Sequence, residues 1–137
     1  MKNSAVALWT LMTKPFNTKI FKQFALVLLL AQALVVQANC SRVASEADDA
    51  YTYSRRALRE TDFDSAKNYM RRAKNSADDA NSLASACRCS NVKNYTDDAY
   101  TYARRGYNSS DLSELLGYAK RAMNAAESAM DAARACR

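Results

Sequence analysis

Four cysteines are the residues of this chain whose chemistry is easiest to specify: Cys40, Cys87, Cys89 and Cys136. Four cysteines allow three disulfide connectivities. Two of them bound each of two similar sequence units, described below, so the repeat favours the pairs Cys40–Cys87 and Cys89–Cys136. Each bond would close a loop of about 48 residues, which the chain-entropy model values at roughly 4 kcal/mol. The sequence therefore predicts two disulfides.

The same cysteines permit a second interpretation, a metal site. In an up-down-up-down helical bundle all four would meet at one end, where thiolates could hold tetrahedral zinc or Cu(I). The single residue between Cys87 and Cys89 is a narrower spacing than structural zinc pairs usually have, and the chain has no histidine. Disulfides without a cofactor are the first prediction, and a thiol-rich metal-binding or carrier protein is the alternative.

Charged residues form the second chemical pattern. The segment Asp48-Asp49-Ala50-Tyr51-Thr52-Tyr53-x-Arg55-Arg56 recurs from Asp97 to Arg105. Acidic and basic pairs seven residues apart lie roughly 10 Å apart along a helix. If Cys40 faces Cys87 in an antiparallel hairpin, charges of one sign on the two helices lie level. The predicted basic layer is Arg55, Arg56, Arg71, Arg72, Arg104, Arg105, Lys120 and Arg121, and the predicted acidic layer is Asp48, Asp49, Asp78, Asp79, Asp97, Asp98 and Glu127.

These two layers have several possible roles. The basic layer could hold a polyanion such as envelope phosphate or acidic glycan, and the acidic layer could hold a divalent cation. Layers of opposite sign could also pair between molecules and produce self-association. Alternatively, both layers are solvated surfaces joined by staggered salt bridges, each of which contributes little to stability.

Catalytic chemistry has little support in the sequence. There is no histidine, no Gly-rich phosphate loop and no carboxylate pair in an apolar setting, so no general base near neutral pH is apparent. We therefore expect a non-enzymatic interaction or structural protein that acts through its exposed charged layers. A polyanion- or envelope-binding module is a further alternative.

The residues above are positioned by an internal repeat. At an offset of 49 residues, positions 40–88 match positions 89–137 at 22 of 49 places, both boundary cysteines included. The predicted organisation is an N-terminal segment, 1–38, followed by two units, 39–88 and 89–137.

Each unit has the pattern of two helices. Small or apolar residues recur at alternating spacings of three and four, typical of a helix seam, and the chain holds only two Gly and one Pro. The seam positions are Cys40, Val43, Ala47, Ala50, Ser54, Ala57; Phe63, Ala66, Met70, Ala73, Ala77, Ala80, Ala84, Cys87; Cys89, Val92, Thr96, Ala99, Ala103, Gly106; and Leu112, Leu115, Ala119, Ala122, Ala126, Ala129, Ala133, Cys136.

The expected helices are 41–58, 63–86, 91–107 and 112–135. Asp62 can cap the second helix, and Asp111 with Glu114 forms a box-like start to the fourth. Short loops force antiparallel neighbours. The predicted fold is all-α, with two tandem disulfide-stapled antiparallel hairpins packed as an up-down-up-down four-helix bundle. Larger side chains beside the seam would join the hairpins, among them Tyr51, Tyr53, Tyr69, Tyr100, Tyr102, Tyr107 and Tyr118.

Residues 1–38 are typical of a secretory signal. Three lysines precede a run of about 13 apolar residues, which is shorter than the roughly 20 that span a bilayer. We expect cleavage after Ala38, with translation beginning at Met1 or Met12, and a secreted or periplasmic product with no membrane span in the mature chain. An uncleaved anchor helix and a lipid on Cys40 are the alternatives. Disulfides suit an oxidising compartment.

The same segment explains most of the net charge. The whole chain carries +6, but residues 1–38 hold four lysines and no acid, so the rest has 16 basic and 14 acidic residues. That remainder of +2 argues against a specific nucleic-acid partner. The partner is therefore expected to be a protein or a polyanion of the envelope.

Overall fold

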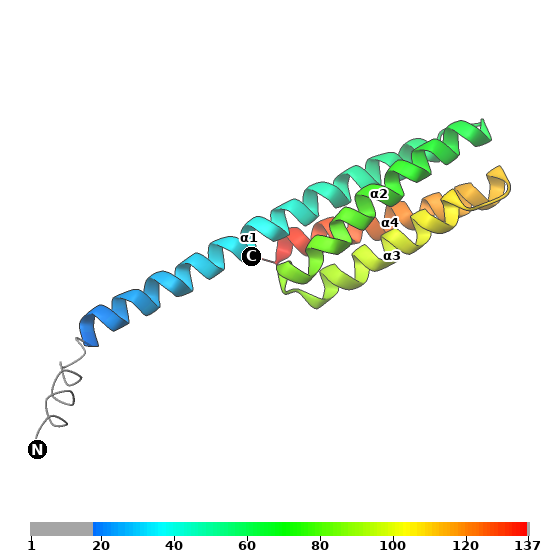
Figure 1. Cartoon of the computed structure of the whole chain (residues 1–137). Coiled ribbons are helices and arrows are strands. Elements are labelled where there is room, and N and C mark those ends of the chain that lie inside the picture. Colours follow the sequence, from blue (N-terminus) through cyan, green and yellow to red (C-terminus); the bar gives the residue numbers. More distant parts are fainter. Residues whose placement is uncertain (1–17, 137) are drawn as a thin grey trace, which may run out of the picture. The chain divides into compact units, whose positions relative to one another are not determined.

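The chain folds as α-helices joined by short turns. A computed structural model describes the backbone of residues 18–136, and the side chains of residue 37 and residues 39–136. Its helices are α1 Thr18–Ala57, α2 Phe63–Cys87, α3 Ser90–Tyr107 and α4 Leu112–Ala135, and the described residues contain no strand (Figure 1). Contacts divide the chain into two units, Met1–Ala33 and Leu34–Arg137, and the helical bundle is the second. The all-helical prediction is confirmed.

The bounds of α2, α3 and α4 agree with those predicted to within one residue, but α1 begins earlier than expected. It was expected near residue 41 and is helical from Thr18. Residues 18–57 hold neither Gly nor Pro, so nothing in the sequence interrupts the helix there. Of the predicted signal segment, residues 1–17 lie outside the described residues, and 18–36 are described only as helical backbone, so the cleavage prediction is not tested. None of the described helices has the length and hydropathy needed to cross a membrane.

The predicted alanine seam forms the centre of the bundle. One layer consists of four buried alanines, one from each helix: Ala50, Ala77, Ala99 and Ala126. Because no long side chain stands between them, the four helices can approach closely there. A second cluster, with Met70 and Leu115, lies toward the α1–α2 and α3–α4 turns, and a third surrounds the cysteines. Met70 and Leu115 are the largest fully buried side chains among the described residues, so the core is thin.

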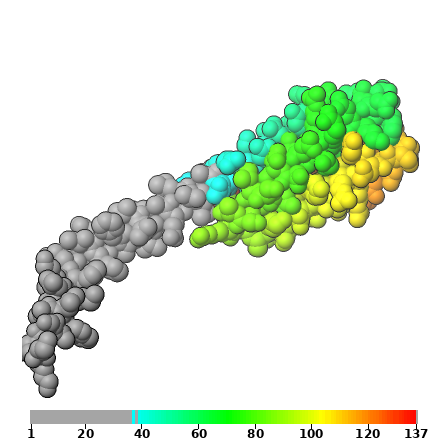
Figure 2. Space-filling model, in the orientation of Figure 1, coloured from blue at the N-terminus to red at the C-terminus, as the bar shows by residue number. Residues whose placement is uncertain are grey.

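The tyrosines flank this seam, as expected for large amphipathic side chains. Tyr53, Tyr69, Tyr102 and Tyr107 are half-buried and pack against the cluster that contains Met70 and Leu115. That cluster draws residues from all four helices, so these rings help to join one hairpin to the other. α3 packs against both α2 and α4, whereas α2 and α4 touch far less, as diagonal helices do. Figure 2 shows α2 and α3 side by side along one face.

A polar network joins α2 to α3. Asn81 Nδ2 donates to Asp97 Oδ1 at 2.9 Å, while Asn81 Oδ1 accepts from Lys93 Nζ at 2.5 Å and lies 3.2 Å from the buried Thr96 hydroxyl. The repeat places Met130 at the position equivalent to Asn81, and Met130 packs in an apolar cluster instead. The two faces between hairpins therefore differ in chemistry, although the repeat relates them.

Asp62 and Asp111 both form the N-cap hydrogen bonds expected of them. Asp62 Oδ2 accepts from the Ser65 backbone N–H at 2.7 Å, and Asp111 Oδ1 accepts from the Glu114 N–H at 2.9 Å. The bond from Ser65 lowers the pKa of the Asp62 carboxyl below its ordinary 3.8, because it favours the charged form. These caps fix where α2 and α4 begin after their turns.

Candidate functional site

The two predicted disulfides are present at the end of the bundle where α2 connects to α3. Cys40 bonds to Cys87 with 4.8 Å between their Cα atoms, and Cys89 bonds to Cys136 with 6.5 Å between theirs. Each bond joins the two segments of one hairpin at the end of the bundle opposite the α1–α2 and α3–α4 turns. The predicted connectivity is confirmed, and none of the four cysteines is left free.

The two disulfides also lie against each other. The sulfur atoms of Cys40, Cys87 and Cys136 are all within 4.8 Å of one another. Cys40 and Cys87 are buried and Cys136 is half-buried. The carbonyl oxygen of Cys87 lies 3.4 Å from the sulfur of Cys40 and 3.6 Å from that of Cys136. Among the described residues, this is the only place where three potential metal ligands of the Cys, His or carboxylate type converge.

The basic layer lies nearer the opposite end, on the outside of the bundle. In each hairpin, arginines of this layer contact tyrosine rings. Arg56 and Arg72 lie over the ring of Tyr53, at 5.9 and 5.8 Å from its centroid, so α1 and α2 present their arginines side by side. Arg121 of α4 lies 5.9 Å from the ring centroids of both Tyr102 and Tyr118. It therefore contacts α3 in the way that Arg72 of α2 contacts α1. All eight predicted members are exposed: Arg55, Arg56, Arg71, Arg72, Arg104, Arg105, Lys120 and Arg121.

None of these eight side chains is neutralised by a carboxylate of the described residues. The salt bridge found in that part of the chain joins Lys93 to Asp97 at 3.3 Å, and it lies outside the basic layer. The staggered salt bridges considered from the sequence are therefore not formed by the basic layer. The tyrosine rings limit the freedom of three of the arginines, Arg56, Arg72 and Arg121.

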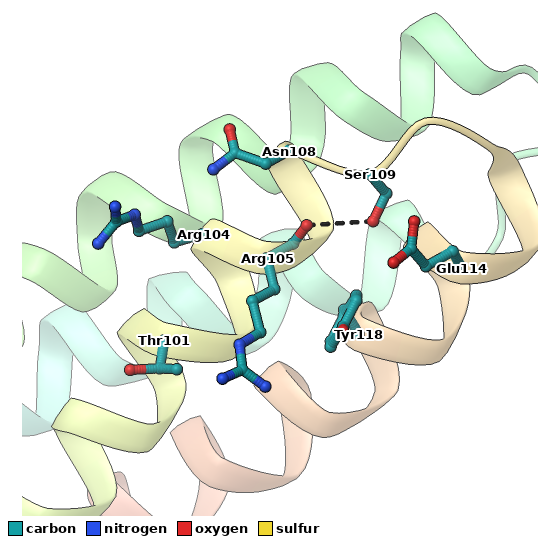
Figure 3. Close-up of a pocket in the computed structure, with 7 residues that line it drawn as sticks. All are labelled: Thr101, Arg104, Arg105, Asn108, Ser109, Glu114 and Tyr118. Atoms are coloured by element: carbon teal, nitrogen blue, oxygen red, sulfur yellow. Dashed lines mark hydrogen bonds between the residues drawn. The ribbon is translucent and has the colours of Figure 1, made fainter.

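A hollow opens in the part of the basic layer that α3 and α4 carry. It has a volume of about 490 Å³, and Figure 3 shows its seven lining residues: Thr101, Arg104, Arg105, Asn108, Ser109, Glu114 and Tyr118. The guanidinium groups of Arg104 and Arg105 point in different directions, and the buried Ser109 hydroxyl donates to the Arg105 carbonyl at 3.1 Å. A smaller hollow of about 230 Å³ shares Glu114 and Tyr118 with it and adds Gly117 and Arg121.

Sequence reasoning missed these hollows. Glu114 was expected to complete a capping box with Asp111, but no return bond from its carboxylate to the Asp111 N–H is present, and its side chain lines both hollows instead. One signal was available in the repeat. Gly117 stands where the first unit has Asn68, so α4 lacks a side chain at the rim of the smaller hollow.

The acidic layer is exposed as well, and it includes one residue that the sequence pattern did not mark. Glu46 is half-buried, and its pKa is raised above the ordinary 4.5, first by burial and then by the charges of Asp79 and Asp49, with Arg42 opposing them. Acidic residues of α1 and α2 are thus close enough to repel. The Asp97 carboxylate accepts hydrogen bonds from Lys93 Nζ and Asn81 Nδ2. The exposed members are Asp48, Asp49, Asp78, Asp79, Asp97, Asp98 and Glu127.

Comparison with known protein families, curated proteins and solved structures found no match to this chain.

Proposed function

We propose that this chain is an exported, non-enzymatic binding protein whose basic layer takes a polyanionic partner. The observation that carries the proposal is the set of eight exposed basic side chains, contributed by all four helices, none of which is in an ion pair within the described part of the chain. Exposed charges of one sign, left unpaired by the fold, attract ligands of the opposite sign over distances of about a Debye length.

The residue types favour ligands with phosphate, sulfate or carboxylate groups. Seven of the eight basic residues are arginines, and the guanidinium group binds such oxyanions through two parallel N–H donors. Arg72 and Arg121 each lie within cation–π distance of a tyrosine ring, 5.8 Å from the Tyr53 centroid and 5.9 Å from the Tyr102 centroid. Acidic glycans and anionic polymers of a cell envelope have this chemistry.

Export is the part of the proposal that explains the bundle's construction. A thin alanine core buries little area from each residue, so two disulfides are a large contribution to its stability. Structural disulfides persist in oxidising compartments, which supports a secreted or periplasmic location together with the signal-like pattern of residues 1–38.

A non-enzymatic role is part of the proposal for two reasons. The chain contains no histidine. Glu46 and Asp62, whose pKa values are shifted, lie outside both hollows, so neither is placed to act as an acid or base there.

Retention on a heparin column, with elution by a salt gradient, tests this proposal. We expect the double variant Arg104→Gln/Arg105→Gln to elute at clearly lower salt than the unmodified protein. The matched control is Arg42→Gln/Arg134→Gln, which removes the same charge from exposed positions near the disulfide end and should change elution much less. Equal shifts for both variants would mean that net charge alone governs retention. A protein that does not bind heparin or anionic vesicles at low salt would refute the proposal.

Pairing of the acidic and basic layers between molecules is the competing use of the same charges. Sedimentation velocity at low and high salt separates the two, because a charge-paired oligomer dissociates as salt rises. A monomer at both salt concentrations that still binds heparin supports polyanion binding.

A further inference from the structure

The end of the bundle that carries the disulfides gathers sulfur from three helices. Cys40 is in α1, Cys87 ends α2 and Cys136 follows α4, yet their sulfurs lie within 4.8 Å of one another. Cys89 is outside this group, although its sulfur is bonded to that of Cys136. Two independent hairpin staples do not require such an approach. It results from the way in which the hairpins pack against each other.

The spacing suits a shared metal ion. A zinc–thiolate bond is about 2.3 Å long, so two sulfurs of a tetrahedral site lie about 3.8 Å apart. Once a disulfide is reduced its two sulfurs are free to separate, and movements of about 1 or 2 Å would bring all three to that spacing. Thiolates are soft ligands that select Cu(I) and Zn(II) over harder cations.

The surroundings of the three sulfurs are apolar. Val43, Ala84, Val92 and Ala133 are buried around the cysteines, with one such residue from each of the four helices. This apolar shell limits the access of water to the site. Thiolates among apolar side chains are costly unless they are paired with a positive charge, which a bound metal ion would supply.

We propose that the reduced bundle binds one soft d10 cation, Cu(I) or Zn(II), through the sulfurs of Cys40, Cys87 and Cys136. Reduction by a dithiol supplies two electrons and two protons to each disulfide, and each reductant molecule leaves as its own cyclic disulfide. The four thiols so formed include the three ligands, which release their protons as the ion binds. The proposal is independent of the basic layer.

The test uses the full-length chain, reduced with dithiothreitol, freed of reductant without oxygen and titrated with Cu(I) or with Zn(II). Native mass spectrometry counts the ions bound, and circular dichroism follows thermal unfolding. We expect one ion per chain and a higher Tm, because an ion that binds the folded state preferentially stabilises it. The oxidised chain should bind neither ion. The two titrations show which of the cations the site takes.

Two variants make the assignment of ligands specific. Cys89→Ser and Cys136→Ser remove the same disulfide, so they lose the same covalent staple. After reduction, Cys89→Ser should keep the metal-dependent rise in Tm, and Cys136→Ser should bind at least about tenfold more weakly, as expected when a ligand is lost. Equal affinity in the two variants would overturn the proposal. So would binding of either ion without a gain in helix or Tm, since an unfolded chain of thiols can also bind metal.

Discussion

The terminal methyl of Met70 in α2 lies 2.7 Å from the point that a Cβ on Gly106 of α3 would occupy. Tyr118 Cβ of α4 lies 3.2 Å from the same point. Three helices therefore approach closely at the one seam position of α3 that lacks a side chain. The repeat relates Gly106 to Ala57 and Met70 to Ala119, so the equivalent pair consists of two alanines, and a large side chain faces a glycine only at Met70 and Gly106.

The chain's two glycines should respond in opposite ways to alanine. A Cβ on Gly117 would meet no atom within 4 Å, so Gly117→Ala should stabilise the fold by up to about 1 kcal/mol through helix propensity. Gly106→Ala should destabilise it, because overpacking typically costs about 1–3 kcal/mol and outweighs the same gain. Thermal and urea unfolding measure both. If the contact with Met70 is the cause, Gly106→Ala should cost less in a Met70→Ala background.

Ser54 should be more stable as alanine. Its hydroxyl is fully buried and, within the described part of the chain, has no hydrogen-bond partner. An unsatisfied buried polar group costs roughly 1–3 kcal/mol, so Ser54→Ala should raise the free energy of unfolding by about 1 kcal/mol. The repeat supplies the control, since the equivalent residue is Ala103, also buried. Ala103→Ser should lower stability, and a stabilising effect there would show that the seam accepts hydroxyls.

Much of this architecture could be predicted from the sequence because it depends on spacing. The alternation of three and four residues predicts which face of α2 is buried, whatever helix packs against it. Because of the repeat, the same pattern predicts the buried face of α4. The cysteine pairs follow from the same rhythm, because Cys40 and Cys87 continue the seams of neighbouring helices. Capping by Asp62 and Asp111 is local, so it could also be predicted.

The features that escaped prediction depend on side-chain directions at single positions. Glu114 has two available uses, a bond back to Asp111 or a place beside the hollow, and spacing does not choose between them. Asn81 and Met130 occupy equivalent places, yet one enters a polar network and the other an apolar cluster, because their neighbours on the next helix differ. The approach of Cys136 to Cys40 and Cys87 depends on how the hairpins dock, which no pattern within one hairpin specifies.

Glu46 should make the stability of the fold depend on pH at values above the ordinary pKa of a glutamate. Its folded pKa is raised, so the folded state holds the proton more tightly than the unfolded state does. The contribution that favours folding is complete below about pH 4.5 and is lost as pH rises through the higher folded pKa. Glu46→Gln should therefore raise Tm at pH 7 and leave it nearly unchanged below pH 4.5.

Substitutions at two neighbours should shift the Glu46 pKa in opposite directions. NMR titration of the Glu46 carboxyl measures both shifts. Asp79→Asn removes a negative charge that raises the Glu46 pKa and should bring it down. Arg42→Gln removes the positive charge that opposes this effect and should raise it further. A Glu46 pKa that does not respond to Asp79→Asn would mean that the acidic residues of α1 and α2 are farther apart than described.

The two disulfides should differ in their contribution to stability although they close loops of equal length. Both have a sequence separation of 47, so the chain-entropy contribution, roughly 4 kcal/mol, is the same for each and cancels in a comparison. What remains is packing. Cys40 and Cys87 are 2% and 0% exposed, whereas Cys89 and Cys136 are half-buried. Cys40→Ala/Cys87→Ala should therefore lose more stability than Cys89→Ala/Cys136→Ala, because it also leaves a cavity among buried side chains. Urea unfolding of the two double variants measures the difference directly, and the reverse order would show that the outer bond, not the buried one, holds the end of the bundle closed.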